Sequence, residues 1–216
     1  MSNLIITIIS IALAAIVGIM AIFYMGQAAS NSSAKVMAVR LNNGLVQMRT
    51  AVNAYMSDTG HDFVSDLPSA TSNPLQSEME TALEPKYLNS FPAFPAEMQQ
   101  AGENCAGVYL ASANGQFNAS AGGGVIVVYY YNGSACHTTK LAVDTCKQLV
   151  AQNHGPGADP PGSANSGWVA AVQPKFVLGQ MDCYSSYTLA NMDNCIIPSG
   201  GSNDPCNIMF VGMLYQ

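Results

Sequence analysis

The stretch of sequence that decides the fold is LIITIISIALAAIVGIMAIFYM, which runs from Leu4 to Met25. Only three of its 22 residues are not apolar, and no charged residue occurs before Lys35. About 20 consecutive apolar residues cross the hydrocarbon core of a bilayer as a helix, so the stretch predicts a membrane span. The alternative, a cleaved signal peptide, needs a basic start and a shorter apolar core. The sequence offers only small residues for such a cleavage, around Gln27–Ala29.

The helix is predicted to continue beyond the apolar stretch as a stem, residues 26–57. The stem contains no proline, and its apolar residues recur at alternating spacings of four and three. That spacing is typical of a helix face that packs against another surface over several turns. Gly44 interrupts the good helix formers and is interpreted as a flex point or an indifferent surface glycine. The stripe consists of Ala34, Ala38, Leu41, Leu45, Met48, Val52 and Tyr55.

The stem is predicted to end near residue 57, because Gly60 suits the left-handed residue that follows a helix end. One continuous helix over about residues 3–57 would be roughly 80 Å long at 1.5 Å per residue. The alternative is a membrane anchor followed by a separate, short coiled-coil stalk. Either way the sequence predicts two domains, a helix over residues 1–57 and a globular head over residues 58–216.

Charge is scarce in this chain and unevenly distributed. Charged residues make up 9% of the 216 residues, against about 25% in an average soluble domain. The net charge of −6 argues against a nucleic-acid partner, which would require a basic face. The stem carries three cations, while all 13 acidic residues follow from Asp58, so the head carries −9. Basic residues beside a membrane span usually stay in the cytoplasm, which would place the head inside the cell.

The cysteines favour the opposite location. All six lie in the head, no C-x-x-C pair occurs, and the intervals fit no zinc ribbon. An even set of cysteines in a polar domain predicts up to three disulfides in an oxidising compartment, and we follow this second indication. Removal of a basic leader from before Met1 would reconcile the two. The cysteines are Cys105, Cys136, Cys146, Cys183, Cys195 and Cys206.

The head is predicted to be α+β with an antiparallel sheet, because strands, a helix and further strands follow one another. A short helix is expected over 76–83 and a longer one over 140–152, capped by Thr138 or Thr139 and with Cys146 on its packed face. The most strongly predicted strand is Val125–Tyr131, VIVVYYY. Further strands are expected over 108–110, 168–172, 175–179, 187–189 and 208–214.

Nothing in the sequence indicates an enzyme. No nucleophile elbow, phosphate-binding loop or dinucleotide fingerprint occurs, so we expect no catalytic residue and no cofactor. The three histidines, at 61, 137 and 154, are far apart and are predicted to be surface residues. Asp58 and Asp62 flank His61 as a cation site would require, but a helix cap and its following turn explain them as well, and no metal site is predicted.

The apolar N-terminal stretch, the long amphipathic helix and the cysteine-containing α+β head together resemble the type IV pilins, the subunits of bacterial type IV filaments. The larger head, with Cys146 on a helix and Cys206 shortly before the last strand, is similar to the type IVb subclass of toxin-coregulated, bundle-forming and conjugative thin pili. The resemblance implies a major pilin that is anchored in the inner membrane, meets the pilus assembly machinery, and polymerises into an extracellular filament or fimbrium of the kind that serves cell adhesion.

The resemblance also implies which residues act. A helix that is apolar all round must be buried in lipid or among other helices, and bundled copies would supply that burial. A Cys146–Cys206 disulfide is implied by the same resemblance, and with it we expect Cys183–Cys195 across a short loop and Cys105–Cys136 from the remaining pair. The residues expected to pack in the filament core are Ile5, Ile9, Leu13, Ile16, Met20, Phe23, Leu41, Leu45, Met48 and Val52.

One residue departs from the family pattern. Type IV pilins usually carry a glutamate at the fifth position of the mature chain, where this sequence has Ile5. Either the numbering does not begin at the mature end, or the filament assembles without the ion pair which that glutamate makes. Three other functions stay open: a minor or tip pilin with an adhesive head, a pseudopilin of a secretion system, and a monomeric, membrane-anchored periplasmic binding protein.

Overall fold

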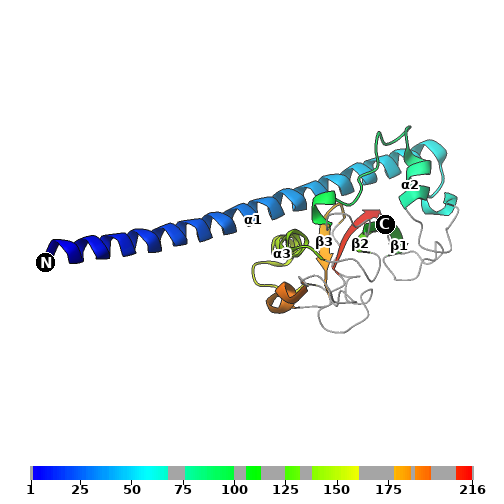
Figure 1. The fold of residues 1–216 in the computed structure, drawn as a ribbon. Helices are drawn as coiled ribbons and strands as arrows, with labels where there is room; N and C mark the ends of the chain where they lie inside the picture. Colours follow the sequence, from blue (N-terminus) through cyan, green and yellow to red (C-terminus); the bar gives the residue numbers. More distant parts are fainter. Residues whose placement is uncertain are drawn as a thin grey trace.

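The computed structural model describes the backbone of residues 2–67, 76–99, 106–112, 125–131, 138–160, 178–185, 188–195 and 208–215. In the N-terminal helix, side chains are described from residue 31 onward. The architecture is α+β, with one long helix at the N-terminus and a four-stranded antiparallel sheet in the head (Figure 1). The fold class predicted from the sequence is confirmed at this level.

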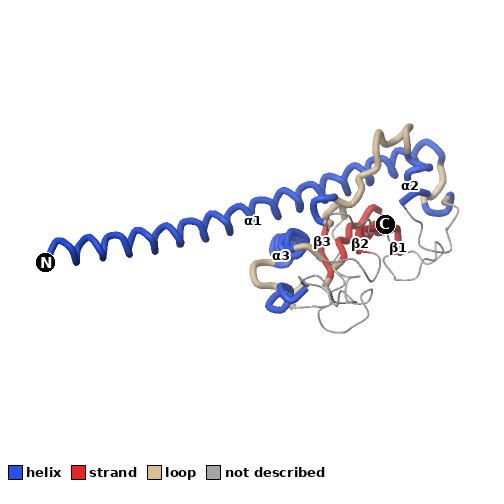
Figure 2. Tube along the Cα trace, viewed as in Figure 1, coloured by secondary structure: helices blue, strands red, loops and turns tan. Residues whose placement is uncertain are grey.

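Helix α1 (Ser2–Thr59) is a single, uninterrupted helix of 58 residues, about 87 Å long at 1.5 Å per residue. This confirms the continuous helix expected over residues 3–57. The helix ends at Gly60, which has a φ of 72° and donates its backbone N–H to the Met56 carbonyl at 2.9 Å. Figure 2 shows α1 as a rod that extends far beyond the rest of the molecule.

The sheet has the strand order β1-β2-β4-β3, and all three neighbouring pairs are antiparallel. Strand β2 (Val125–Tyr131) has the predicted bounds, and β1 (Ala106–Ser112) extends the strand expected over 108–110. Strand β4 (Met209–Tyr215) lies one residue later than expected. The C-terminal strand therefore lies inside the sheet, between β2 and the short edge strand β3 (Met181–Tyr184).

The helices of the head also follow the sequence pattern. Helix α2 (Gln76–Leu83) has the expected bounds, and α3 (Lys140–His154) runs two residues past its predicted end. The Thr139 hydroxyl oxygen caps α3 by accepting from the Ala142 backbone N–H at 3.2 Å. The buried face of α3 includes Cys146 and Leu149, as the periodicity predicts. Three 3₁₀ turns complete the described elements: η1 (Val64–Asp66), η2 (Ala96–Met98) and η3 (Leu189–Cys195).

In the last third of the chain, the strand predicted over 187–189 is wrong, and the one predicted over 175–179 can be checked only at its last two residues, which belong to no strand. Leu189, placed in a strand over 187–189, begins the 3₁₀ turn η3. In the segment 175–179, the described residues are Leu178, which makes an isolated parallel bridge to Met213, and Gly179, which turns with a φ of 78°. The strand that exists instead, β3, has only four residues, too few to show a periodicity. The strand expected over 168–172 lies outside the described residues.

The core lies between the C-terminal half of α1 and the sheet. Leu45 of α1 is fully buried, and its methyl groups lie over Gly212 of β4, where a Cβ atom would come within 2.5 Å of them. Glycine at 212 therefore lets the helix approach the sheet closely. Helix α3 contacts both α1 and β3, so the two helices lie beside each other against the β3–β4 side of the sheet.

Candidate assembly surfaces

Helix α1 has two halves with different surroundings. We call residues 31–59, whose buried side chains begin at Ala34, the packed half, and residues 2–30 the projecting half; Figure 1 shows the N-terminal part of α1 extending away from the head. Of the described elements, α2, α3, β3 and β4 contact α1, and in Figure 1 all four lie beside the packed half. One end of the molecule is therefore a bare helix and the other a helix covered by its own head.

Six of the predicted filament-core residues lie on the projecting half, of which the structure describes the backbone alone. These are Ile5, Ile9, Leu13, Ile16, Met20 and Phe23. The predicted membrane span, Leu4–Met25, lies on the same half. In the part of the chain that the structure describes, no helix is both long enough and apolar enough to cross a membrane.

The other four predicted filament-core residues have a different role. Leu41, Leu45, Met48 and Val52 are at most 3% exposed, because the chain's own head covers them. The prediction that these four side chains pack against other copies in a filament core is therefore wrong. Periodicity shows that a helix has an apolar stripe, but it does not show whose surface covers the stripe, and here the nearest sheet belongs to the same chain.

The face of α1 that the head leaves open carries a second set of apolar residues. Val36, Val39 and Val46 are 57%, 55% and 50% exposed. Among the described residues only Leu178 is a further exposed large apolar side chain. We call the side of α1 that bears the three valines the outer face. The outer face was not predicted from the sequence, although the valines form a stripe opposite the first one.

A groove runs between the outer face and the segment Ser90–Ala96. Its volume is about 710 Å³, and it is lined by Val36, Val39 and Arg40 of the helix and by the proline-rich segment opposite. Gly44 lets that segment approach, since a Cβ atom there would lie 3.0 Å from the Pro92 side chain. Gly44 is therefore buried and needed for close packing, and is neither a flex point nor an indifferent surface glycine.

Polar contacts hold the two walls of the groove together. The buried Tyr129 hydroxyl donates to the Pro92 carbonyl at 2.9 Å, and burial raises the pKa of this phenol, which keeps it a neutral donor. At the rim, Arg40 pairs with Glu97 at 2.7 Å. The pKa of Glu97 lies below its usual value, first because its carboxylate accepts from the backbone N–H of the same residue and then because of Arg40. The groove is thus a built feature of the head.

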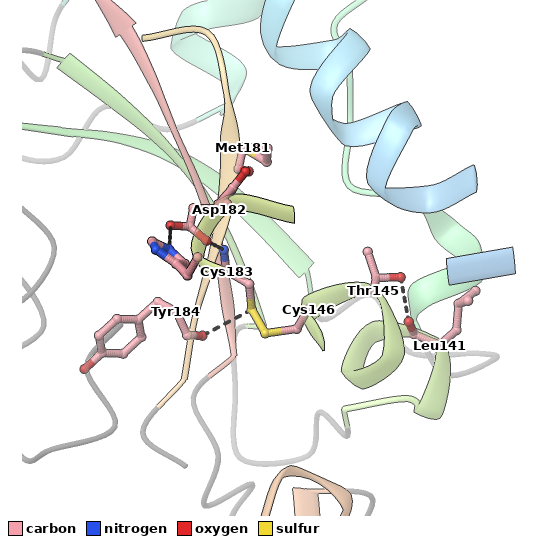
Figure 3. The surroundings of a disulfide bond; sticks show 9 residues. Leu141, Thr145, Cys146, Met181, Asp182, Cys183 and Tyr184 are labelled. Carbon is pink, nitrogen blue, oxygen red and sulfur yellow. Dashed lines mark hydrogen bonds and ion pairs between the residues drawn. A yellow bond between two sulfur atoms is a disulfide. The ribbon is translucent and has the colours of Figure 1, made fainter. Parts of the chain in front are cut away.

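A disulfide joins α3 to the sheet (Figure 3). It connects Cys146 to Cys183 of β3, with the Cα atoms 5.1 Å apart. The predicted pairs Cys146–Cys206 and Cys183–Cys195 are therefore wrong. Their error follows from the missed strand, because β3 lies directly against α3. Cys105, Cys136 and Cys206, and the Cys195 side chain, lie outside what the structure describes.

His154 lies next to this disulfide and is not an ordinary surface histidine. Its Nε2 atom lies 2.6 Å from Asp182 Oδ2, and its side chain is 20% exposed. The other oxygen of Asp182 accepts the backbone N–H of Cys183 at 2.8 Å. The last turn of α3 is thus tied to β3 beside the covalent link, which indicates a clamp that stabilises the head. Of the other two histidines, His61 is exposed and His137 lies outside the described residues.

The acidic residues in the last turn of α1 and just after it, Asp58 and Asp62, bond within the protein. Asp58 accepts from Lys86 and from the Tyr87 hydroxyl, and Asp62 accepts from the Tyr215 hydroxyl at 3.0 Å. No group of three or more His, Cys, Asp or Glu residues that could hold a metal occurs among the residues described. These contacts fasten the end of α1 to the turn after α2 and to the last strand.

The described surface features are therefore a bare helix, an apolar helix face and a groove, which suit contacts with another macromolecule. Comparison with protein families, curated proteins and solved structures finds no match to this chain.

Proposed function

We propose that the chain is a structural subunit, the major pilin of an extracellular filament of the type IV pilus kind, which assembles by bundling of its N-terminal helices. The observation that supports this most is the single 58-residue helix α1, whose N-terminal part extends far beyond the head that covers its second half (Figure 1). A helix used only inside one domain would not need that extension, since helices of globular proteins average about 11–12 residues.

The composition of the projecting half explains why copies would associate. Its Leu4–Met25 stretch is apolar on all sides, so it requires lipid or other helices around it. Each Å² of apolar surface removed from water contributes about 25 cal/mol. Before assembly the inner membrane would provide this environment, and in the filament the helices of other copies would replace it.

The shape of the molecule favours an open polymer. The bare helix is at one end and the head at the other, so a contact between the helix of one copy and the stem of the next joins two different surfaces. Contacts of this heterologous kind build helical filaments when the rotation does not close into a ring. The acidic head, with its buried disulfide, would form the solvated outside.

The subclass remains part of the proposal. Assignment to the type IVb pilins relies on the size of the head and on a cysteine-bearing helix, α3. It no longer relies on the Cys146–Cys206 pair, because Cys146 is bonded to Cys183. The bridge from α3 to an edge strand would serve the same purpose, fixing the helix against the sheet.

Detergent removal tests the function. The full-length chain, extracted in detergent and then freed of it, is expected to sediment as fibres visible by negative-stain electron microscopy. Ile16→Glu, in the projecting half, is expected to abolish sedimentation, because a carboxylate in an apolar bundle has no partner. The matched control is Gln152→Glu, which adds the same group to an exposed position of α3 and should leave the fibres intact.

The same experiment can reject the proposal. A wild-type chain that stays monomeric or forms only amorphous aggregates without detergent would favour a single anchored protein of the periplasmic-binding kind. Fibres that form equally well with Ile16→Glu would show that something other than the projecting half holds the polymer together.

A further inference from the structure

We propose that the outer edge of β3 is a strand-pairing surface that three side chains keep closed, and that it accepts an extended segment of a second copy when they are lost. The three residues, which we call the edge caps, are Asn42 of α1, Asn153 of α3 and Asp182 of β3 itself. This goes beyond the proposed function, because it concerns a contact between heads that the fold prevents.

Strand β3 lies at the end of the sheet order, and β4 is its partner among the described strands. In an antiparallel pair, successive residues direct their backbone groups alternately toward the partner strand and away from it. Met181 points away from β4, because its N–H and its carbonyl both bond to side chains, and by alternation Cys183 does too. Such an edge is a template for another chain, and natural proteins block it.

Three of the four outward backbone groups of Met181 and Cys183 have side-chain partners. The Met181 N–H donates to Asn42 Oδ1 at 2.7 Å, and the Met181 carbonyl accepts from Asn153 Nδ2 at 2.8 Å. The Cys183 N–H donates to Asp182 Oδ1 at 2.8 Å (Figure 3). An added strand would bond to these same groups, so each edge cap occupies a place that another chain would need.

The edge caps are held in position by the elements around β3. Asn153 and His154 belong to the last turn of α3, and His154 Nε2 lies 2.6 Å from Asp182 Oδ2, which orients the capping carboxylate. Asn42 is half-buried in the packed half of α1. The disulfide keeps β3 against α3. The edge is therefore closed only while both helices are docked on the sheet.

Strand β3 lacks the usual guards of an edge. Lysine, proline and bulges commonly block edge strands, but β3 reads Met-Asp-Cys-Tyr and its four side chains are all buried. Its one charged residue, Asp182, is itself an edge cap. The edge can be reached from solvent at Asn153, which is exposed. Side chains from two helices thus replace guards that the strand does not carry.

Removal of two edge caps from the full-length chain in detergent tests the proposal. The Asn42→Leu/Asn153→Leu double variant is expected to form oligomers that bind thioflavin T, whereas the wild type elutes as a monomer in size-exclusion chromatography. At a fixed concentration the oligomeric fraction should rise by about tenfold, as expected for one hydrogen bond gained or lost. The matched control, Asn43→Leu/Gln152→Leu, adds the same side chains at exposed neighbouring positions and should stay monomeric.

The chemistry of each cap gives a second test with single variants. Asn42 accepts a hydrogen bond and Asn153 donates one, so Asn42→Asp keeps its cap and Asn153→Asp loses it. Asn153→Asp should therefore oligomerise and Asn42→Asp should not. Hydrogen exchange of the Met181 amide should be about tenfold faster in Asn42→Leu and close to the wild-type rate in Asn42→Asp.

Thermal melting first shows which variants contain a folded head. Folded variants that lack a cap and stay monomeric would overturn the proposal, as would equal exchange of the Met181 amide in Asn42→Leu and Asn42→Asp. The test is made in detergent and requires no fibre. Its failure therefore leaves the proposed function intact, and a wild type that forms no fibres leaves the edge caps unaffected.

Discussion

The two halves of α1 belong to one helix but differ in how their apolar residues can be buried. The buried apolar residues of the packed half form a stripe on one side, so the chain's own head covers them, with Leu45 lying over Gly212. The projecting half is apolar on all sides over Leu4–Met25, so no single head could cover it. The width of an apolar surface, more than its presence, therefore separates a helix that folds within its chain from one that needs several neighbours.

The largest expected effects come from two variants, each of which places one carboxylate in a different half of α1. Leu45→Glu should prevent the head from folding, because it buries a charge without a partner between α1 and the sheet. Ile16→Glu should leave the melting of the head unchanged and abolish only assembly. Circular dichroism in detergent, with thermal melting, measures the first effect, and sedimentation measures the second.

Val46→Glu is the control within the packed half. Val46 is the neighbour of Leu45 in sequence but is 50% exposed, so the head should fold and melt within a few degrees of the wild type. A folded Leu45→Glu variant, or an unfolded Ile16→Glu variant, would mean that the division of α1 into two halves is misplaced.

The next largest effect concerns the clamp that holds α3 to the sheet. Replacing Cys146 and Cys183 together by alanine should lower the free energy of unfolding by about 2–4 kcal/mol and the melting temperature by roughly 5–15 °C. Assembly at a temperature where the head is folded should persist, since the bond lies in the head. A non-reducing peptide map that joins Cys146 to any cysteine other than Cys183 would contradict the pairing.

A smaller effect is expected where the packed half touches the sheet. Gly212→Ala should destabilise the head by about 1–3 kcal/mol through overpacking, because its Cβ would meet Leu45 at 2.5 Å and the Met181 sulfur at 2.9 Å. Denaturant unfolding of Gly212→Ala, Leu45→Ala and the double variant measures the coupling. The double variant should lose less than the two single losses added together, and strict additivity would show that the two residues do not touch.

The smallest expected effect is the pH dependence of the ion pair between Asp58, in the last turn of α1, and Lys86. Lys86, then Tyr87, lower the pKa of Asp58 below its ordinary 3.8, and Asp58 raises the pKa of Lys86 above its ordinary 10.5. The contribution of Asp58 is present above pH 3.8 and is lost as pH falls through its lowered pKa. That of Lys86 is present below pH 10.5 and is lost as pH rises through its raised pKa.

Lys86→Gln should therefore lower the melting temperature slightly between these limits and not at strongly acidic pH. Both side chains are more than half exposed, so salt should weaken the effect. Lys35→Gln, which removes a lysine that makes no bond to the described residues, is the control and should leave the profile unchanged. A loss with Lys86→Gln that persists at strongly acidic pH would be inconsistent with an ion pair.

Local signals in the sequence predicted most of the regular elements. The absence of proline and the spacing of apolar residues indicated α1, VIVVYYY indicated β2, and the hydroxyl before Lys140 indicated the start of α3. Each of these signals lies within the element that it predicts or directly next to it. They required no knowledge of which surfaces meet in the folded chain.

The features that the sequence did not reveal depend on contacts between distant segments. Strand β3 is recognisable only beside α3 and β4, and with it the partner of Cys146. The groove exists because the segment around Pro92 folds back onto Gly44, 48 positions earlier in the numbering. The outer face of α1 is defined by the head, which covers the opposite face of the helix.

The most direct test of the central claim is a helical reconstruction of the assembled fibre by electron cryo-microscopy. The account predicts that residues 2–30 of neighbouring copies lie about 8–10 Å apart along a common axis, with the heads outside. A fibre in which the heads alone touch, and in which the N-terminal helices are separated by solvent, would contradict it.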